Sequence, residues 1–202
     1  MASPRVTRRS GPGRPGYDLD SLLSVAVKVF NEKGYDGTSM ETLAQRLGIT
    51  KSSIYHHVSG KEELLELALG RALNGLFAVT TEPEVTSGPY IDRLEHLVRR
   101  SVQVLATELP YVTLLLRVRG NSPVERRALA RRREFDDVVA RLVSEAVSEG
   151  DLRPDIDPAL ISRLLFGMVN SLIEWYSPRG GTSVDQLADA VVHMTFEGLR
   201  TH

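Results

Sequence analysis

From residue 17 to residue 200 the apolar residues recur with the period of an α-helix, and no segment alternates as a half-buried strand would. Glycines, prolines and short polar turns separate the apolar stripes. The pattern predicts helices over residues 17–33, 39–47, 51–58, 61–79, 90–108, 110–119, 123–149, 158–176 and 183–200, with a linker at 80–89. The predicted fold class is therefore all-α, without an internal repeat.

Length and composition narrow the class of protein. A chain of 202 residues is long enough for one or two domains with a substantial core. It contains no cysteine, which excludes disulfides, thiolate catalysis and cysteine-ligated zinc. It also lacks an apolar run of the roughly 18 residues that a membrane span needs, and its first residues lack the apolar stretch of a signal peptide. We therefore expect a protein that remains in the cytoplasm and does not contact the membrane.

The formal net charge of −1 conceals an uneven distribution. Residues 1–61 contain nine Lys and Arg against five Asp and Glu, which gives +4, whereas residues 62–202 contain sixteen against twenty-one, which gives −5. Such asymmetry favours a nucleic-acid partner for the basic end. We expect a disordered basic arm at 1–16, a small helical domain at 17–61 and a larger helical domain at 62–202.

The most informative stretch is residues 38–61, with the sequence TSMETLAQRLGITKSSIYHHVSGK. Thr38, with Glu41 three residues later, has the spacing of a capping box and predicts the start of a short helix. Gly48 allows the positive φ of a tight turn, and Thr50 predicts the start of the next helix. Two short helices joined in this way are typical of a helix-turn-helix motif, so residues 17–61 are predicted to form a three-helix DNA-binding domain.

The second helix of this motif has an exposed face rich in hydrogen-bond donors rather than in alternating Glu and Lys. Hydroxyl and imidazole groups can reach base edges and phosphates from a major groove, and a lysine attracts phosphates. His57 is expected to pack behind the helix. A structural three-helix cap without DNA is the alternative. The residues expected on the DNA-contacting face are Thr50, Lys51, Ser52, Tyr55 and His56.

The stretch GYDGTSMETLAQRLGITKSSIYHHVSGKEELL resembles the N-terminal domain of TetR-type repressors. The resemblance covers residues 20–68, although Val58 stands where the family most often has phenylalanine. It implies a homodimer whose two recognition helices enter successive major grooves of a pseudo-palindromic double-stranded DNA operator. Thr38 falls at the family's spacing and joins the candidate DNA-binding residues, and the position of Lys61 commonly meets a phosphate in the family.

The basic arm adds a separate signal for DNA. The residues Pro12-Gly13-Arg14-Pro15 are similar to the Gly-Arg-Pro core of an AT-hook, whose arginine lies in a narrow A·T-rich minor groove. Arg14 is therefore a candidate DNA-binding residue. A solubilising tail without DNA contact is the alternative.

In the family, the domain after the fourth helix senses a small-molecule effector and forms the dimer. Residues 158–176 are apolar on most faces of the expected helix, so several neighbours must cover it. With the last helix it suits the four-helix dimer interface that the resemblance implies, and a monomeric core is the alternative. The residues expected in this interface are Leu165, Val169, Leu172, Leu187, Val191 and Met194.

A ligand pocket is expected in the second domain, lined by apolar side chains with a few polar ones. Five arginines within residues 126–133 could receive phosphates or a carboxylate, and a solvated face is the alternative. The segment EWYSPRGG at 174–181 resembles a branch of the family whose effectors are commonly acyl-CoA thioesters, which implies such an effector. The residues expected to line the pocket are Tyr111, Leu115, Arg132, Phe135, Arg163, Phe166, Asn170 and Trp175.

No motif of catalysis is found. The sequence has no phosphate loop, dinucleotide glycine fingerprint or serine elbow. His56 and His57 have no metal-ligating residue three or four positions away within their helix. We expect no enzyme, metal or cofactor. Two other functions stay open beside a ligand-released repressor: a ligand-independent architectural DNA-binding protein, and an all-helical small-molecule-binding protein.

Overall fold

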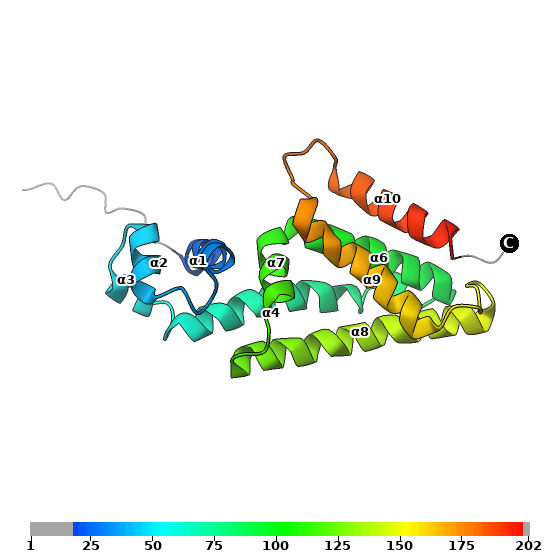
Figure 1. Cartoon of the computed structure of the whole chain (residues 1–202), viewed down its shortest axis with the longest axis horizontal. Coiled ribbons are helices and arrows are strands. Elements are labelled where there is room, and N and C mark those ends of the chain that lie inside the picture. The colour runs from blue at the N-terminus through cyan, green and yellow to red at the C-terminus, as the bar shows by residue number, and fades with distance from the viewer. Residues whose placement is uncertain (1–17, 200–202) are drawn as a thin grey trace, which may run out of the picture.

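The computed structural model describes residues 18–199, and within that range all the regular elements are helices, as predicted. Figure 1 shows a cluster of three helices at one end and a larger helical body at the other, with α4 passing from one to the other. The predicted arm at 1–16 lies outside the described residues. The elements are α1 (Leu19–Lys33), α2 (Met40–Leu47), α3 (Lys51–Tyr55), α4 (Lys61–Val79), α5 (Pro83–Thr86), α6 (Tyr90–Thr107), α7 (Leu109–Arg117), α8 (Pro123–Glu149), α9 (Pro158–Trp175) and α10 (Val184–Glu197).

Helices α1, α2 and α3 share one small apolar core, and each begins at a polar cap. The side chains of Asp18, Ser39 and Thr50 each accept a hydrogen bond from the backbone N–H three residues later. Gly48 has a φ of 67°, a conformation that favours glycine and turns the chain between α2 and α3. The core residues are Leu22, Leu23, Ala26, Phe30, Leu43, Leu47, Ile54 and Val58.

The start of α2 differs from the prediction. Ser39 is its N-cap, whereas Thr38 is buried and its hydroxyl donates to the carbonyl oxygen of Gly34 at 2.7 Å. The predicted capping box between Thr38 and Glu41 is therefore wrong, since Thr38 stabilises the turn after α1 instead. Two adjacent hydroxyl residues give the same sequence signal, and only the backbone geometry decides which of them caps the helix.

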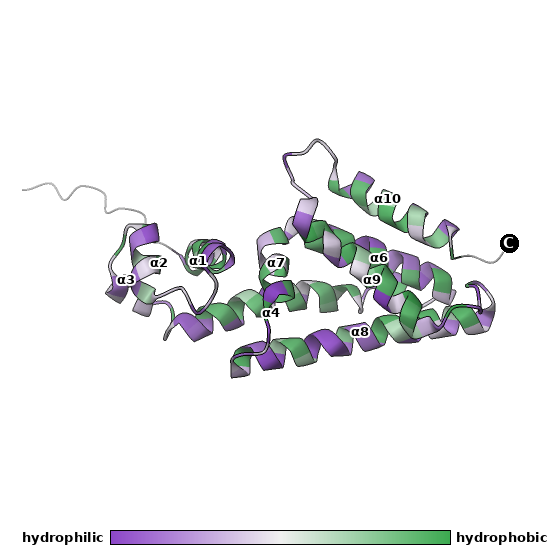
Figure 2. Ribbon diagram, viewed as in Figure 1, coloured by the Kyte–Doolittle hydropathy of each residue, from purple (hydrophilic) through white to green (hydrophobic). Residues whose placement is uncertain are grey.

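Helix α4 belongs to both parts of the molecule. It packs on α1 of the three-helix cluster and on α6, α7 and α8 of the larger body. Figure 2 shows polar residues at its first turn and apolar residues along much of the rest. Helix α7 also packs on α1, so α4 and α7 carry the main contacts between the two parts. The buried residues of α4 are Leu64, Leu65, Ala68, Leu69, Ala72, Leu73 and Val79.

Helix α6 is the centre of the larger body. It packs on α10, α8, α5 and α4, and more lightly on α7 and α9, while α8 packs along α9. The long helix α8 has the predicted bounds, because Pro123 in its first turn and Gly150 after its last turn, with a φ of 87°, are strong signals. Helix α3 ends at Tyr55, three residues before its predicted end. Among residues 18–199, no helix combines the length and apolarity that crossing a membrane requires.

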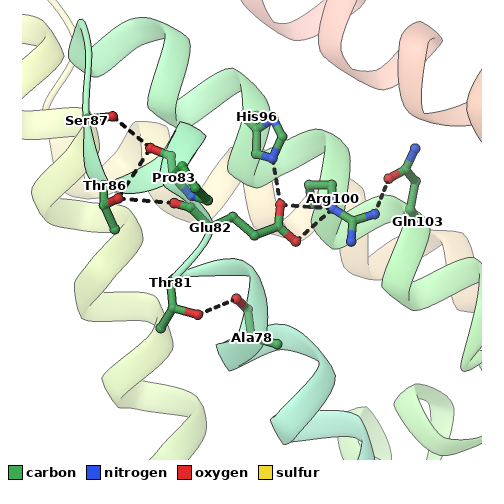
Figure 3. A network of polar contacts seen from close by, with 9 residues as sticks. All are labelled: Ala78, Thr81, Glu82, Pro83, Thr86, Ser87, His96, Arg100 and Gln103. Atoms are coloured by element: carbon green, nitrogen blue, oxygen red, sulfur yellow. Dashed lines mark hydrogen bonds and ion pairs between the residues drawn. The ribbon is translucent and has the colours of Figure 1, made fainter.

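The segment 80–89, predicted as a linker, contains the short helix α5 and is fixed to α6 by polar contacts (Figure 3). The carboxylate of Glu82 lies 2.7 Å from His96 Nε2 and 3.0 Å from Arg100 Nε. Burial raises the pKa of Glu82, but hydrogen bonds from His96 and Arg100 outweigh it, so the pKa lies below its usual value. Arg100 continues the network to Gln103, which donates to Asp185 of α10 at 2.8 Å.

Candidate DNA-reading surface and internal cavity

Helix α3 presents the surface that the sequence predicts to read DNA. Thr50, Lys51, Ser52, Tyr55 and His56 are all exposed, while Ile54 is fully buried and fixes the helix to the core. Tyr55 is 47% exposed, which is unusual for a large aromatic side chain among the described residues. An exposed aromatic hydroxyl surrounded by short hydrogen-bond donors suits contacts with bases and phosphates.

Lys51 is paired with a neighbour from α2. It forms an ion pair with Glu41, and its ammonium lies 6.0 Å from the ring centre of Tyr55. The hydrogen bond from Lys51 lowers the pKa of Glu41 below its usual value, and the same bond raises the pKa of Lys51. Both side chains are about half exposed, so solvent screens the pair. Lys51 can therefore exchange Glu41 for a phosphate at little cost.

Lys61 has a structural partner at the start of α4. Its ammonium donates to the carbonyl oxygen of Tyr35 at 2.9 Å and lies 4.2 Å from the centre of the Tyr35 ring. This contact joins α4 to the turn between α1 and α2. Because an ammonium has three donors, Lys61 can keep Tyr35 and still bind a phosphate.

Other predictions at this end have different outcomes. Arg14 lies outside the described residues. The side chain of Thr38 is buried and already bonded, so its hydroxyl is not available to DNA. His57 is exposed rather than packed, because α3 has ended before it. The sequence reasoning missed Ser39, which is exposed at the N-terminus of α2, where a helix favours an anion.

The described part of the N-terminal region, residues 18–61, carries no net formal charge. Of the nine basic residues in 1–61, four lie in 1–17, and none of the five acidic residues does. Residues 18–61 therefore contain five basic and five acidic residues. The charge of +4 therefore belongs to Arg5, Arg8, Arg9 and Arg14, and a basic segment of this kind is attracted to DNA at long range.

A small, largely apolar cavity of about 30 Å³ lies inside the larger body, among α4, α6, α7, α8 and α9. The rings of Phe135 and Phe166 meet edge to face in its wall, with centres 5.5 Å apart. Ser101 of α6 and Asn170 of α9 are the uncharged polar residues in the lining. Five of the residues predicted to line a pocket line this cavity: Leu115, Arg132, Phe135, Phe166 and Asn170.

A wider groove of about 590 Å³ adjoins the cavity between α8 and α9. The predicted residue Arg163 lies along it, together with Arg133 and Asp137. The four residues that line both spaces are Arg132, Asp136, Phe166 and Asn170. The cavity and the groove therefore form one site, with aromatic walls inside and charged side chains outside.

Asp136 is the acidic group between the two spaces. Desolvation by the surrounding protein raises the pKa of this carboxyl above its usual value, Arg132 opposes the shift, and the negative charge of Asp137 adds to it. An anion that enters the groove therefore meets arginines together with an acid that takes up a proton more easily than a free aspartate does.

The arginines of residues 126–133 divide into two groups. Arg126 donates to the carbonyl oxygen of Gly120, Arg127 pairs with Glu66 of α4, and Arg131 donates to Asn74 and lies over Phe77. These three fix α8 to its neighbours. Arg132 and Arg133 line the groove instead. The predicted anion-binding group is thus two arginines of this run, with Arg163 added from α9.

Tyr111 and Trp175 line neither the cavity nor the groove, so the structure does not bring these two predicted residues to this site. Tyr111 is buried under the guanidinium of Arg71, which lies 4.4 Å from the ring centre. Trp175 is 63% exposed at the last turn of α9. The sequence analysis did not identify Ser101. The signal that could have identified it is its position as a single polar residue inside the apolar stripe of α6.

Most residues predicted for the dimer interface are buried within a single chain. Met194 is 74% exposed, but the five others are interior: Leu165, Val169, Leu172, Leu187 and Val191. The two on α10 belong to a helix that packs closely on α6. The prediction is wrong for these five because α9 and α10 are apolar on more than one face, and helical periodicity does not tell which face points inward.

One group of the described residues brings three possible metal ligands together. Glu82, Glu84 and His96 each place a ligand atom within 4.8 Å of the others. Glu82 already binds Arg100, whose positive charge lies where a cation would need to approach. This group is therefore best explained as the ion-paired anchor of α5.

Comparison with known families assigns the chain. Residues 22–68 match the model described as bacterial regulatory proteins of the tetR family, and residues 87–199, more than half of the chain, match the model described as tetracyclin repressor-like, C-terminal domain. The chain therefore belongs to the TetR family of bacterial transcriptional regulators. Among curated relatives, the transcriptional repressor KstR2 of Mycolicibacterium smegmatis is 26% identical over 93% of each chain, and KstR2 of Rhodococcus jostii is 28% identical over 88% of this chain and 89% of that protein.

Solved structures agree with this assignment. A TetR-family regulator from Streptomyces coelicolor A3 is 57% identical, covers 89% of this chain and 91% of its own, and superposes with a TM-score of 0.84. AibR, solved in complex with isovaleryl coenzyme A and operator DNA, is 28% identical over 88% of this chain and 97% of its own, with a TM-score of 0.71. The predicted family, the all-helical architecture and the function of a DNA-binding transcriptional regulator are confirmed.

Proposed function

We propose that this protein is a homodimeric cytoplasmic repressor that leaves its DNA operator when an acyl-CoA thioester or a related apolar acid binds between α8 and α9. The observation that carries the proposal is the placement of α4 and α7. Both helices line the cavity, through Leu76 and Leu115 among others, and both pack on α1 of the DNA-reading cluster. A ligand that separates the cavity walls therefore displaces the helices on which that cluster rests.

Polar contacts at the start of α7 support this coupling. The side-chain amide of Asn31 on α1 donates to the carbonyl oxygen of Pro110 at 2.8 Å. Arg71 of α4 binds both carboxylate oxygens of Glu108, at 2.7 and 2.9 Å, a geometry that resists rotation. Because α7 is tied to α1 and to α4 at one end, a movement of its cavity-lining residues reaches both.

The chemistry of the site favours a ligand with an anionic part and an apolar part. Arg132, Arg133 and Arg163 line the outer groove, and Phe135 and Phe166 form aromatic walls further inside. The related AibR structure contains isovaleryl coenzyme A, a short acyl group on an anionic carrier. By the same logic, an acyl group would occupy the cavity of this protein and the phosphates of the carrier would lie near the arginines.

A second copy of the chain is proposed to cover the outer faces of α9 and α10. Apolar side chains that are this exposed in a single chain indicate a protein partner. On α9, Leu160, Leu164, Gly167 and Ser171 follow one another at intervals of four, three and four residues, which places them in one stripe. The large apolar residues exposed on these two helices are Leu160, Leu164, Trp175 and Met194.

Each copy would place α3 in a major groove, with the two heads on successive grooves of the operator. Thr38 is replaced by Ser39 in this assignment, because the Thr38 hydroxyl is bonded inside the chain. Arg14 is kept as a candidate contact from the arm. The residues assigned to DNA are Arg14, Ser39, Thr50, Lys51, Ser52, Tyr55, His56 and Lys61.

The test is fluorescence anisotropy of the full-length protein on labelled DNA from upstream of its own gene, at about physiological salt. Scrambled DNA of equal length is the DNA control, and free coenzyme A is the ligand control for butanoyl-, hexanoyl- and octanoyl-CoA. We expect tight binding to the upstream DNA alone and release by at least one thioester. Equal binding to scrambled DNA would identify an architectural protein, and thioester binding without any DNA preference would identify a small-molecule-binding protein. Selective DNA binding that no thioester changes would retain the regulator and reject the ligand class.

A further inference from the structure

Ser101 carries a buried hydroxyl without a hydrogen-bond partner. The residue is 1% exposed, lies on α6 and lines the cavity. A serine or threonine within a helix often donates to the carbonyl oxygen four residues earlier, and the buried Thr195 does so to Val191 at 2.7 Å. Buried Thr38 is satisfied as well, by Gly34. Among the buried hydroxyls of residues 18–199, those of Ser101 and Ser162 are the exceptions.

One of the two other unpartnered oxygens also lies at the ligand site. Within the described range, three buried side-chain oxygens have no partner: Asn31 Oδ1, Ser101 Oγ and Ser162 Oγ. Ser101 lines the cavity and Ser162 lines the groove, so two of the three belong to the same site. A buried polar atom without a partner destabilises a fold, and its presence in a binding site is explained if a ligand supplies the partner.

The surroundings of Ser101 restrict what can reach it. A volume of about 30 Å³ accommodates roughly one or two heavy atoms, so only a short end of a ligand enters without displacing the walls. The charged lining residues Arg132 and Asp136, together with Asn170, lie where the cavity meets the groove. The rest of the lining is apolar: Leu76, Leu105, Val112, Leu115, Leu116, Phe135, Phe166 and Val169.

We propose that Ser101 is a specificity-determining residue that hydrogen-bonds to a carbonyl or hydroxyl oxygen at the buried end of the effector. The inference rests on the proposed function, because it assigns a chemical feature to the ligand of that same site. A serine hydroxyl both donates and accepts, so either kind of oxygen satisfies it. A purely hydrocarbon end leaves the hydroxyl unpaired and binds less tightly.

The first test needs no ligand. If the Ser101 hydroxyl is unsatisfied in the free protein, Ser101→Ala removes a destabilising group and raises the melting temperature by about 2–4 °C. Ser148→Ala is the matched control for helix propensity, because Ser148 is an exposed helical serine that donates to the Ser144 carbonyl oxygen at 2.9 Å. A Ser101→Ala variant that melts no higher than Ser148→Ala would show that the hydroxyl is already satisfied, which overturns the inference.

The second test uses matched ligands. Butanoyl-, hexanoyl- and octanoyl-CoA are each compared with the thioester that carries a hydroxyl on its terminal carbon, by calorimetric titration of the full-length protein. We expect at least one hydroxylated ligand to bind about 3- to 10-fold more tightly than its parent, a preference that Ser101→Ala abolishes and Ser148→Ala retains. Equal binding within every pair would overturn the inference while leaving the proposed function intact. Failure of all six thioesters to bind would overturn the acyl-CoA effector class and this inference with it.

Discussion

The DNA-reading end and the ligand-binding body are built from the same kind of amphipathic helix, yet their functional residues lie on opposite sides of those helices. On α3 the candidate residues face solvent, and almost all of them come from residues 38–61. In the body the residues that line the cavity surround an internal space and come from five helices between residues 76 and 170. A surface site is thus a local property of one motif, whereas a cavity is a property of how distant helices pack.

This contrast separates the two activities physically. DNA contact depends on donors and charge that solvent already surrounds, so changes there leave the fold intact. Ligand contact depends on space and on unpaired polar atoms inside the core, so changes there also alter stability. Helices α4 and α7 carry the main contacts between the two parts and are therefore the elements through which one site is expected to affect the other.

The largest expected effect would contradict a strict division between the two ends, because a substitution in the larger body is expected to weaken DNA binding. Leu164→Glu places a charge in the exposed stripe of α9 and is expected to give a monomer. Since linked heads bind with an avidity gain of about 10²–10⁴, operator affinity should fall by at least about 100-fold. Light scattering measures the molecular mass, and fluorescence anisotropy measures the operator affinity. Ser144→Glu, an exposed change on α8, is the control, and it should change neither the mass nor the affinity. A dimer that survives Leu164→Glu would place the interface elsewhere.

The next effect is confined to the DNA-reading end. Tyr55→Ala and Lys51→Ala should each weaken operator binding by about 5- to 100-fold, in line with the loss of one good base or phosphate contact. The mass of the dimer and its melting temperature should stay unchanged, because both side chains are exposed. Lys28→Ala on α1 removes an equal charge from another exposed position and is the matched control. Unchanged operator binding in both variants would show that α3 is not the recognition helix.

A third prediction sharpens the comparison within the DNA-reading end itself, between the neutral helices and the basic segment before them. Removal of residues 2–16 should make the dependence of log Kd on log salt shallower by about 0.9 for each arginine that contacts a phosphate. Preference for the operator over scrambled DNA should persist, since α3 supplies it. Anisotropy titrations at several salt concentrations measure both quantities. An unchanged salt slope would identify the segment as a tail without DNA contact.

The smallest expected effect concerns the acid of the groove. Because the pKa of Asp136 is raised, this carboxyl takes up a proton at a higher pH than an ordinary aspartate as the pH falls. Its protonation removes a negative charge beside Arg132, so the affinity for an anionic thioester should rise a few-fold toward acidic pH. Asp136→Asn should bind more tightly at neutral pH and lose that part of the pH dependence. Glu134→Gln, an exposed change on the same helix, should behave as the wild type in calorimetry.

Local signals were sufficient for most of the fold. Pro123 and Gly150 correctly predicted the two ends of α8. The spacing from Gly48 to Ile54 predicted the turn after α2 and the presence of α3. These elements are fixed by residues a few positions apart, which is the range over which periodicity and capping act. The same range explains the error at Thr38 and Ser39, where two neighbouring hydroxyls compete for one cap.

The inward-facing site was less predictable. The sequence identified Phe135 and Phe166 as lining residues but also Tyr111 and Trp175, because an aromatic residue at helical spacing suits a cavity wall, a core or a surface equally well. The same ambiguity misplaced the dimer stripe on α9, which has two apolar faces. Ser101 was missed because a single serine in an apolar helix acquires meaning only when its missing partner is known.

The length of α4 determines how far a small tilt in the larger body displaces the three-helix cluster. Its 19 residues extend over roughly 28 Å, so a tilt of about 5° about its far end displaces its N-terminus by about 2.5 Å. Contacts to base edges tolerate misplacement of only about 0.5 Å. In the proposed dimer, two copies that move in opposite directions would change the separation of their three-helix ends by about 5 Å, against the roughly 34 Å between successive major grooves. A small rotation of α4 that leaves every helix intact is therefore sufficient to move both α3 helices of the proposed dimer out of register with successive major grooves.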